Sequence, residues 1–328
     1  MKATNCRVLI FLFGLVCLCV TPSLAQERQG YPLRPVRFII PFPPSGGTDI
    51  VGRSVGQKFA ERLGQPFVID NRPGAAGTLG CAIAAKAAAD GYTIVLVTAS
   101  FAISASYYKN LAYDPVGDFD AVGLVASQPA VLVTHPSVQA TSVKELIALA
   151  RANPNKLNYA SGGAGGINHL AAEMLKSMTG IRIVHVPYKG LGPALTAVVA
   201  GEVQLMVATL GSSLPLIKSG KLRALALGAG KRSSSAPDLA TLAESGVPGY
   251  EVDNWYGVLV PRGTPQGIID LLNKQIALAI GEQEIRERFA ALGFEPATPS
   301  TPRQFASYVK SEIAKWARAM KDAGVTRE

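Results

Sequence analysis

The chain has 328 residues and a net charge of +9, from 32 Lys and Arg against 23 Asp and Glu. The basic residues are spread along the sequence, without a dense Lys/Arg cluster or interleaved aromatic residues, so the composition argues against a nucleic-acid partner while remaining compatible with an anionic ligand. The length exceeds that of one ordinary core and indicates two domains.

Residues 1–25 have the pattern of a cleaved signal peptide. A basic start precedes an uncharged apolar run over residues 8–20, and the segment ends in Ser23-Leu24-Ala25, a small-x-small sequence that signal peptidase accepts. An N-terminal membrane anchor is the alternative, but a helix of this apolar run would span only about 20 Å, short of a hydrocarbon core of about 30 Å. We therefore expect export to the periplasm with cleavage after Ala25.

Export also bears on the cysteine content. Three of the four cysteines lie within the predicted signal peptide, so Cys81 alone remains in the mature chain. A single cysteine cannot form an internal disulfide, even in an oxidising compartment. The alanine neighbours of Cys81 favour a small buried apolar residue over a reactive thiol.

The mature chain alternates predicted strands and helices in two successive blocks. Apolar runs predict the strands, and apolar residues at four-residue spacing behind a capping residue predict the helices. In the first block we expect strands at 36–41, 67–70 and 92–97, with helices at 48–63 and 78–89. In the second block we expect strands at 130–134, 157–160, 181–185, 203–208, 222–227 and 255–260. Its helices are expected to begin at 142 and 264 and to cover 167–178, 214–219, 283–292 and 302–322. This order predicts an α/β fold with mostly parallel sheets flanked by helices.

The C-terminal helices indicate how the two blocks join. They follow a single strand, so they need a sheet formed elsewhere in the chain, and a return to the first block supplies one. We therefore predict two lobes, with residues 36–125 and 229–328 in lobe 1, residues 126–228 in lobe 2, and chain crossings near 124–128 and 225–228. Two lobes crossed twice leave a cleft between them, where ligands are usually held.

Three glycine-rich loops each follow a predicted strand and open a predicted helix. They are Phe42–Asp49, Asn71–Thr78 and Ser161–His169. Glycine lets a backbone approach a ligand closely, and a helix N-terminus offers unpaired N–H groups with a partial positive charge, a combination that suits phosphate or carboxylate. The alternative is that these are ordinary turns between strand and helix. Because such loops occur in both predicted lobes and would face a shared cleft, we favour an anion site.

Nucleotide, metal and catalytic sites are not indicated. A phosphate-binding loop needs Gly-Lys-Ser/Thr, where the first loop has Gly46-Gly47-Thr48, and Asn168 stands where a dinucleotide fingerprint needs glycine. We see no zinc-binding His-Glu-x-x-His, no Cys-x-x-Cys and no nucleophile with its base, so we expect no enzyme activity, no cofactor and no metal.

The histidines and Asp49 each allow two interpretations. His135, before a proline at a strand end, and His185, within a strand, are interpreted as structural. His169 lies in the first turn of the helix behind the third glycine loop and is a candidate for lining the cleft. Asp49 either complements the dipole of its helix, which we favour, or contacts the ligand.

Nine stretches of the mature chain match the motifs of one protein family and cover nearly all of it: Tyr31-Pro32, 36–49 (VRFIIPFPPSGGTD), 70–77 (DNRPGAAG), 90–93 (DGYT), 144–149, 157–170 (LNYASGGAGGINHL), 185–193 (HVPYKGLGP), 220–225 (GKLRAL) and 248–251 (PGYE). Together they resemble the Bug family, the periplasmic substrate-binding proteins of tripartite tricarboxylate transporters. The resemblance implies a type II periplasmic-binding-protein fold, whose two lobes close like a flytrap. It also implies that backbone groups and waters hold the ligand carboxylates, at the loops matching Phe42–Asp49 and Ser161–His169, with Thr98–Ser100 nearby.

The function implied by the resemblance is capture of a small mono- or dicarboxylate for the membrane permease subunits of a tripartite transporter, by a monomeric receptor. A receptor for a sensor kinase and a periplasmic hydrolase are the alternatives. Two departures from the family pattern leave the ligand open: Ser45 where Gly or Ala is common, and Val207-Ala208-Thr209 where an acidic or amide residue is common. The candidate ligand-binding residues are Phe42, Pro44, Ser45, Gly46, Gly47, Thr48, Asp49, Thr98, Ser100, Ser161, Gly163, Gly165, Asn168, His169, Tyr188 and Thr209.

Overall fold

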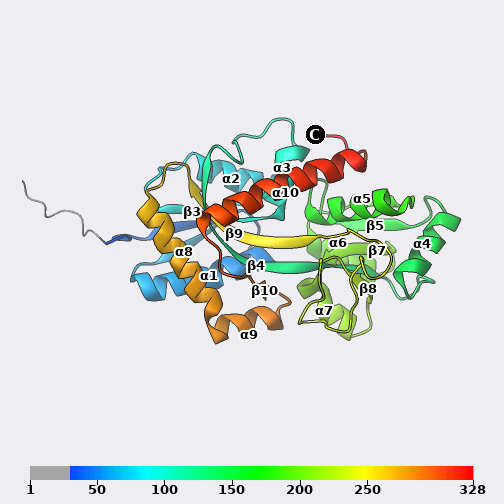
Figure 1. Cartoon of the computed structure of the whole chain (residues 1–328). Coiled ribbons are helices and arrows are strands. Elements are labelled where there is room, and N and C mark those ends of the chain that lie inside the picture. Colours follow the sequence, from blue (N-terminus) through cyan, green and yellow to red (C-terminus); the bar gives the residue numbers. More distant parts are fainter. Residues whose placement is uncertain (1–29, 328) are drawn as a thin grey trace, which may run out of the picture.

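A single mixed sheet runs through the whole molecule, with helices on both of its faces (Figure 1). The computed structural model describes residues 30–327, so the predicted signal peptide lies outside the described residues. The strand order is β2-β1-β3-β9-β4-β7-β5-β6, with β8 and β10 also paired to β4. The strands are β1 Val36–Ile40, β2 Phe67–Asn71, β3 Thr93–Thr98, β4 Phe119–Thr134, β5 Asn158–Ser161, β6 Val184–Pro187, β7 Leu205–Thr209, β8 Arg223–Leu227, β9 Asp253–Pro261 and β10 Glu295–Pro296.

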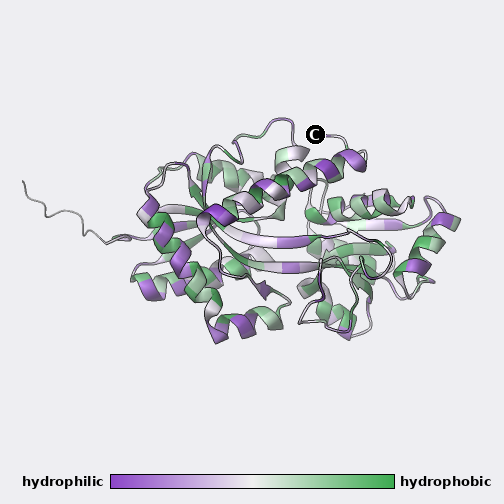
Figure 2. Ribbon diagram, in the orientation of Figure 1, coloured by the Kyte–Doolittle hydropathy of each residue, from purple (hydrophilic) through white to green (hydrophobic). Residues whose placement is uncertain are grey.

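The helices cover the sheet on the sides that the hydropathy pattern predicts, with apolar residues against the strands and charged residues outward (Figure 2). They are α1 Gly47–Leu63, α2 Thr78–Ala85, α3 Ala99–Tyr107, α4 Val143–Ala152, α5 Ile167–Thr179, α6 Leu191–Val199, α7 Leu210–Lys218, α8 Gln266–Gly281, α9 Gln283–Ala291 and α10 Pro302–Asp322, with a short 3₁₀ turn η1 at Ala75–Gly77. None of the helices within residues 30–327 combines the length and apolar character needed to cross a membrane.

Strand β4 belongs to both halves of the sheet. Its part from Phe119 to Pro129 pairs with β9, and its part from Ala130 to Thr134 pairs with β7 and β8. We call the half containing β1, β2, β3 and β9 the first lobe and the half containing β5 to β8 the second lobe. The predicted two-lobed α/β fold is confirmed, and one continuous strand of 16 residues forms the first passage between the lobes.

The strand directions bring the carboxyl ends of the parallel strands together. Strand β9 is antiparallel to both β3 and β4, and β7 is antiparallel to β4, so β3 and β7 point toward each other. Thr98 ends β3 and pairs with Tyr256 of β9, which in turn pairs with Ala126 of β4. Thr209 ends β7 and pairs directly with Ala130 of β4. The two strand ends are therefore four positions apart along β4, about 13 Å on an extended strand.

The segment between β8 and β9 packs on the second lobe, although the prediction assigned it to the first. Leu242 N–H donates to Leu227 O at the end of β8, and the Tyr250 hydroxyl donates to Ala171 O in α5. Leu242 and Tyr250 are both fully buried there, so apolar burial holds the segment on this lobe. The residue boundaries of the lobes stay a prediction, and these contacts favour a second crossing at Asp253 rather than near 225–228.

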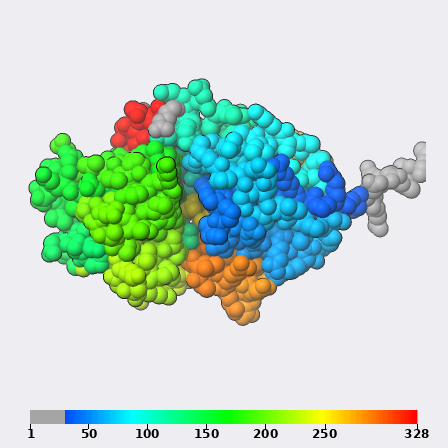
Figure 3. All heavy atoms as spheres, turned by 180° about the vertical axis from the view of Figure 1, so that it is seen from behind, coloured from blue at the N-terminus to red at the C-terminus, as the bar shows by residue number. Residues whose placement is uncertain are grey.

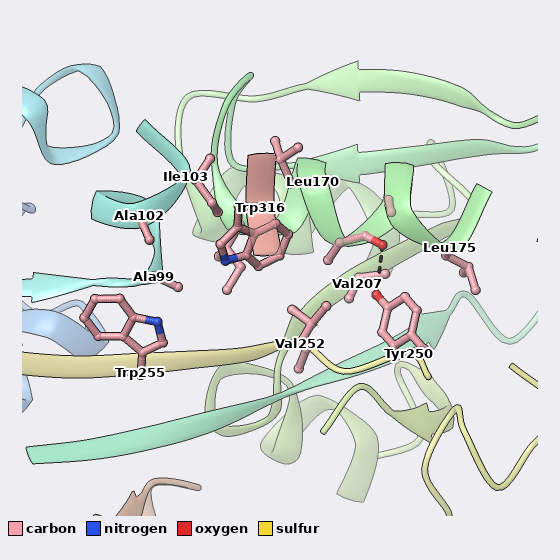
Figure 4. Close-up of a cluster of buried hydrophobic side chains, with 14 of the residues drawn as sticks. Ala99, Ala102, Ile103, Leu170, Leu175, Val207, Tyr250, Val252, Trp255 and Trp316 are labelled. Carbon is pink, nitrogen blue, oxygen red and sulfur yellow. Dashed lines mark hydrogen bonds between the residues drawn. The ribbon is translucent and has the colours of Figure 1, made fainter. Parts of the chain in front are cut away.

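Helix α10 lies along both lobes (Figure 1). Its Thr301 N-cap forms a capping box with Gln304, which fixes where the helix begins. The buried carboxylate of Glu312 accepts hydrogen bonds from the indole N–H groups of Trp255 (3.0 Å) and Trp316 (3.2 Å). Figure 4 shows the Trp316 ring beside α3 and α5, in the cluster that forms the core where the lobes meet.

Candidate functional site

Four helices begin where the facing strands end. Helices α1, α3, α5 and α7 follow β1, β3, β5 and β7 directly, and their N-cap residues are Gly46, Thr98, Gly166 and Thr209. Because these strands point toward each other from the two lobes, the positive ends of the helix dipoles converge on one region. Figure 3 shows a hollow at the surface between the first lobe, in blue, and the second lobe, in green.

The caps of α1 and α5 differ from the cap of α3. The Thr98 hydroxyl accepts the Ser100 N–H (3.3 Å), so α3 has a side-chain cap. Gly46 and Gly166 have no side chain, and neither helix start has a side-chain cap. The first N–H groups of a helix have no carbonyl one turn earlier to bond, so these two N-termini keep donors for a ligand or solvent.

The first glycine loop is held by a buried carboxylate. Asp49 accepts hydrogen bonds from the Ser45 N–H (3.0 Å), the Arg53 guanidinium (2.8 Å) and the Asn71 amide (3.0 Å). Burial raises the pKa of the Asp49 carboxyl, but the hydrogen bonds from Arg53, Asn71 and Ser45 outweigh it and lower the pKa below its ordinary value. Asp49 therefore shapes the loop through its side chain, and the predicted ligand contact stays a prediction.

Ser45 has a backbone conformation that suits glycine. Its φ of 66° lies in the left-handed region, which costs a non-glycine residue roughly 1–2 kcal/mol. The Asp49 carboxylate that accepts the Ser45 N–H stabilises this conformation. Local strain of this kind concentrates at ligand clamps and active sites.

The third glycine loop lies against the first lobe. Gly163 and Gly165 have φ values of 131° and 70°, which explains two of its glycines. A Cβ on Gly165 would lie 2.6 Å from the Tyr107 ring of α3, so only glycine allows this approach. The Gly165 N–H donates to Nδ1 of His169 (3.2 Å), so His169 holds the loop, and its place in the lining of the cleft stays a prediction.

A column of rings supports this loop from behind. The His169 and His185 imidazoles stack with centroids 4.2 Å apart, Tyr159 stacks on His185 at 4.8 Å, and Tyr107 meets His169 edge-on at 6.5 Å. Burial, and then the neighbouring His169, lower the pKa of His185 to about 4. The column therefore links the second lobe to α3 of the first, where His169 meets Tyr107, and its middle ring, His185, is neutral at pH 7.

His185, which its position within a strand suggested to be structural only, contacts the third glycine loop. Its Nε2 lies 2.6 Å from Ser161 Oγ, which also accepts the Gly163 N–H (3.2 Å). A serine bonded to a histidine has the geometry of a nucleophile with its base, but the Ser161 side chain is fully buried and bonded within the loop. The pair depends on β5 lying beside β6, which no local pattern indicates.

The remaining candidate residues divide between the two lobes. Phe42, Pro44, Gly46, Gly47 and Thr48 lie on the first loop and the start of α1. In the second lobe, Tyr188 N–H donates to Ser161 O (2.9 Å), the Asn168 amide donates to Val207 O (2.7 Å), and the Thr209 hydroxyl bonds Ser212 (2.7 Å). The structure thus brings Tyr188, Ser161 and Gly163 together.

Two buried residues near the start of α1, Tyr256 and Gln128, were not among the predicted site residues. A Cβ on Gly47 would lie 3.0 Å from the Tyr256 hydroxyl, and this hydroxyl donates to Gln128 (3.3 Å). The Gln128 amide in turn donates to Leu292 O (3.3 Å). Both are buried polar residues on strands that were predicted only in part, so periodicity gave no reason to select them.

One stretch of the sequence has the spacing of a catalytic motif, but in the structure its residues are structural. Gly52-Arg53-Ser54-Val55-Gly56 has the spacing of a nucleophile elbow. It lies inside α1 rather than on a turn, and the buried Ser54 hydroxyl donates to Ile50 O (2.8 Å). Within residues 30–327, no group of three or more His, Cys, Asp or Glu side chains is arranged to hold a metal ion.

Comparisons of the sequence and of the fold with known proteins indicate the same family. The family model described as "Tripartite tricarboxylate transporter family receptor" matches residues 51–325. Protein BugT of Bordetella pertussis is 38% identical over 322 residues, which cover 98% of each chain. The solved structure "R. palustris Rpa4515 with adipate" has a TM-score of 0.85 at 37% identity, covering 91% of this chain and all of that one. MatC from Rhodopseudomonas palustris with bound malate has a TM-score of 0.80 at 32% identity, covering 88% and 99%.

These likenesses extend over nearly the whole chain, and the relatives share its fold as well as its sequence. They confirm the resemblance inferred from the nine matching stretches of the sequence. The chain therefore belongs to the receptors of the tripartite tricarboxylate transporter family, the periplasmic solute-binding proteins that include the Bug proteins.

Proposed function

We propose that the protein captures a small mono- or dicarboxylate between its lobes and delivers it to the membrane permease of a tripartite transporter, as a monomer exported by cleavage after Ala25. The observation that carries this proposal is the pair of glycine-capped helix N-termini, α1 from one lobe and α5 from the other, at the facing strand ends. Their N–H groups and dipoles favour an anion without a cationic side chain. No covalent step is involved, and closure of the lobes supplies affinity.

The ligands of the relatives support the same class. One solved relative is described with adipate and another with malate, both dicarboxylates. Backbone donors recognise the carboxylate and leave the rest of the ligand to other contacts. This explains how relatives with one fold hold acids of different length.

The test places a fixed negative charge at the cap of α1. Gly46 has an extended backbone (φ −80°, ψ 169°), and a Cβ there would meet only Pro43 O at 3.6 Å, so a side chain fits. Asp is also a favourable N-cap, so Gly46→Asp keeps the helix while repelling a carboxylate. We expect Gly46→Asp to bind carboxylates at least 10-fold more weakly than the isosteric Gly46→Asn, measured by calorimetry against a panel of mono- and dicarboxylates.

A matched control separates local repulsion from net charge. Gly267→Asp adds the same charge in the first turn of α8, where a Cβ meets no atom within 4 Å. This helix follows β9, which runs antiparallel to β3, so its N-terminus lies at the far end of the first lobe. Equal affinities of Gly46→Asp and Gly46→Asn, or no binding of any carboxylate by the unaltered protein, would contradict the proposed site.

A further inference from the structure

The outside of the second lobe has a groove that takes no part in the proposed anion site. It lies between α4, the end of α5 and the loop at Gly246, and its volume is about 320 Å³. We call it the outer groove, and its other lining residues are Lys144, Ile147, Ala148, Arg151, Met178 and Thr179. Thr179 ends α5, whose 13 residues place it about 20 Å from the cap at Gly166. Figure 1 shows α4 at the end of the second lobe that points away from the first lobe.

One wall of the outer groove is a stripe of residues on α4. Ile147, Ala148 and Arg151 follow Lys144 by three, four and seven positions, which places all four on one face of the helix. The two cations lie about 10 Å apart along the helix axis, because each residue rises about 1.5 Å. The stripe therefore presents two positive charges with apolar side chains between them.

The opposite wall is formed by Met178 and the loop from Gly246 to Gly249. A Cβ on Gly246 would lie 3.7 Å from Lys144 Cε, and a Cβ on Gly249 would lie 3.9 Å from Met178 Cε. Met178 is 41% exposed although it belongs to the last turn of α5. Methionine is enriched in protein interfaces, where its flexible thioether adapts to a partner surface.

Neither cation of the outer groove pairs with an acidic side chain among residues 30–327. Arg151 is oriented by a hydrogen bond to Thr179 O (2.6 Å), which leaves most of its five N–H donors available. The acids closest in sequence have other partners, since Glu145 accepts N–H and hydroxyl groups at the start of its own helix and Glu244 pairs with Arg232. The positive charge of the outer groove is thus left for a molecule from outside the chain.

The shape and charge of the outer groove distinguish between three kinds of occupant. An exposed cation holds a free anion only weakly, because water and salt compete for both charges. A flat lipid surface would touch the cations without entering the hollow between α4 and Met178. A helix has the same repeat as α4, so an acidic helix can place carboxylates seven positions apart opposite Lys144 and Arg151. Apolar side chains three and four positions after the first carboxylate would then lie beside Ile147 and Met178.

We infer that the outer groove docks an acidic helix of a partner protein. The Arg151 guanidinium, held in place by Thr179 O, binds one carboxylate, and Lys144 binds the other. The apolar side chains between the carboxylates displace water from Ile147 and Met178. Because the outer groove lies about 20 Å from the cap of α5, this inference goes beyond the proposed function and does not depend on it.

The experiment uses two fluorescein-labelled helical peptides with the pattern Glu-x-x-Leu-Leu-x-x-Glu, one as written and one with Gln in place of both Glu. Fluorescence anisotropy at low salt measures their binding to the mature protein. We expect the unaltered protein to bind the Glu peptide about 10-fold more tightly than the Gln peptide. Lys144→Glu should weaken binding of the Glu peptide about 10-fold, and it leaves the fold intact because this side chain has no hydrogen bond or ion pair among the described residues to lose.

Two further variants separate the outer groove from the overall charge. Lys221→Glu makes the same charge change at an exposed loop position of the second lobe, and we expect it to alter affinity for the Glu peptide less than about 2-fold. Met178→Ala keeps the charge, and we expect it to weaken binding of the Glu peptide about 5-fold. Carboxylate affinity of Lys144→Glu, measured by calorimetry, should match that of the unaltered protein.

Three outcomes would overturn the inference. The first is equal affinity for the two peptides, which includes no binding of either. The second is an equal loss of affinity in Lys144→Glu and Lys221→Glu. The third is binding to phosphatidylglycerol vesicles that Lys144→Glu abolishes while neither peptide binds, because the occupant would then be a lipid surface.

Discussion

The carboxylate of Asp49 accepts hydrogen bonds from three places in the chain: its own loop, the next turn of its helix and the end of β2. The sequence suggested a helix dipole or a ligand as its partner. Neither interpretation included Asn71, because that contact depends on β1 lying beside β2. A residue's place in a helix can therefore be predicted from local sequence, whereas its partners across the sheet cannot.

Removing the charge of Asp49 tests this role. Asp49→Asn keeps the shape but directs an amide at donors that need an acceptor, so we expect the free energy of unfolding to fall by about 2 kcal/mol. Urea unfolding at pH 7 measures it. The control is Asp270→Asn, an exposed acid on α8, for which we expect a change below about 0.5 kcal/mol. An Asp49 effect as small as that of Asp270 would contradict the role in holding the loop.

At the scale of elements, periodicity identified the helices with one polar face and missed those without. The helices α1, α5 and α10 were predicted near their observed bounds. Helix α3 was not predicted, because almost all of its residues are buried and no polar stripe marks a 3.6-residue period. Helix α6 begins with Leu191-Gly-Pro and ends in valines, a composition that indicates turn or strand.

The contact of α7 with the first lobe depends on two glycines. A Cβ on Gly211 would lie 2.0 Å from Leu292 O, and a Cβ on Gly293 would lie 2.7 Å from Gly211 Cα. Leu292 and Gly293 precede β10 in the first lobe, whereas α7 belongs to the second. The lobes therefore touch backbone to backbone at this point, and no side chain fits between them.

Gly211→Ala should force this contact apart. We expect a loss of about 1–3 kcal/mol in unfolding free energy and a larger radius of gyration in small-angle scattering, because the lobes cannot close fully. Gly192→Ala is the matched control, since a Cβ there meets no atom within 4 Å and alanine favours the interior of α6. A scattering profile of Gly211→Ala that matches the control would contradict the prediction that this backbone contact limits how far the lobes close.

At the scale of the whole molecule, the two-lobed fold followed from counting strands and helices, but the length of the second lobe did not. The segment 229–252 is rich in turns, and its buried Leu242, Val247 and Tyr250 lie too far apart to form a pattern. Their burial is defined by the surface of α5 and β8. The ring stacking at His185 and the hydrogen bonds of Gln128 likewise arise only once the strands have assembled.

Two partly buried groups, Asp253 and His185, give the molecule opposite dependences on pH. Burial, and then the neighbouring Glu251, raise the pKa of Asp253 to about 6, and its Oδ1 has no hydrogen-bond partner. The folded state thus holds this proton more firmly, and its contribution to stability is lost as the pH rises from about 4 through 6. The lowered pKa of His185, about 4, has the reverse effect, because stability present above about 6.5 is lost as the pH falls toward 4.

The two effects are each worth up to about 3 kcal/mol and oppose each other between pH 4 and 6.5. We expect Asp253→Asn to gain unfolding free energy as the pH rises from 4 to 7, relative to the unaltered protein. His185→Gln should show the opposite slope. Urea titrations at half-unit pH steps measure both, and parallel profiles for all three proteins would contradict the assignment.

Strand β9 has a consequence for the order in which the chain can fold. It lies between β3 and β4 in the middle of the sheet, yet residues 253–261 follow both of those strands by more than 100 positions along the chain. Until residues 253–261 are available, the edges of β3 and β4 that will pair with β9 remain open. All strands of the second lobe, β5 to β8, precede β9 in the chain, so this lobe can form before β9 is available, except for its contacts with α10. Assembly is therefore expected to start in the second lobe and end where the lobes meet, so that the proposed ligand site is among the last parts of the molecule to form.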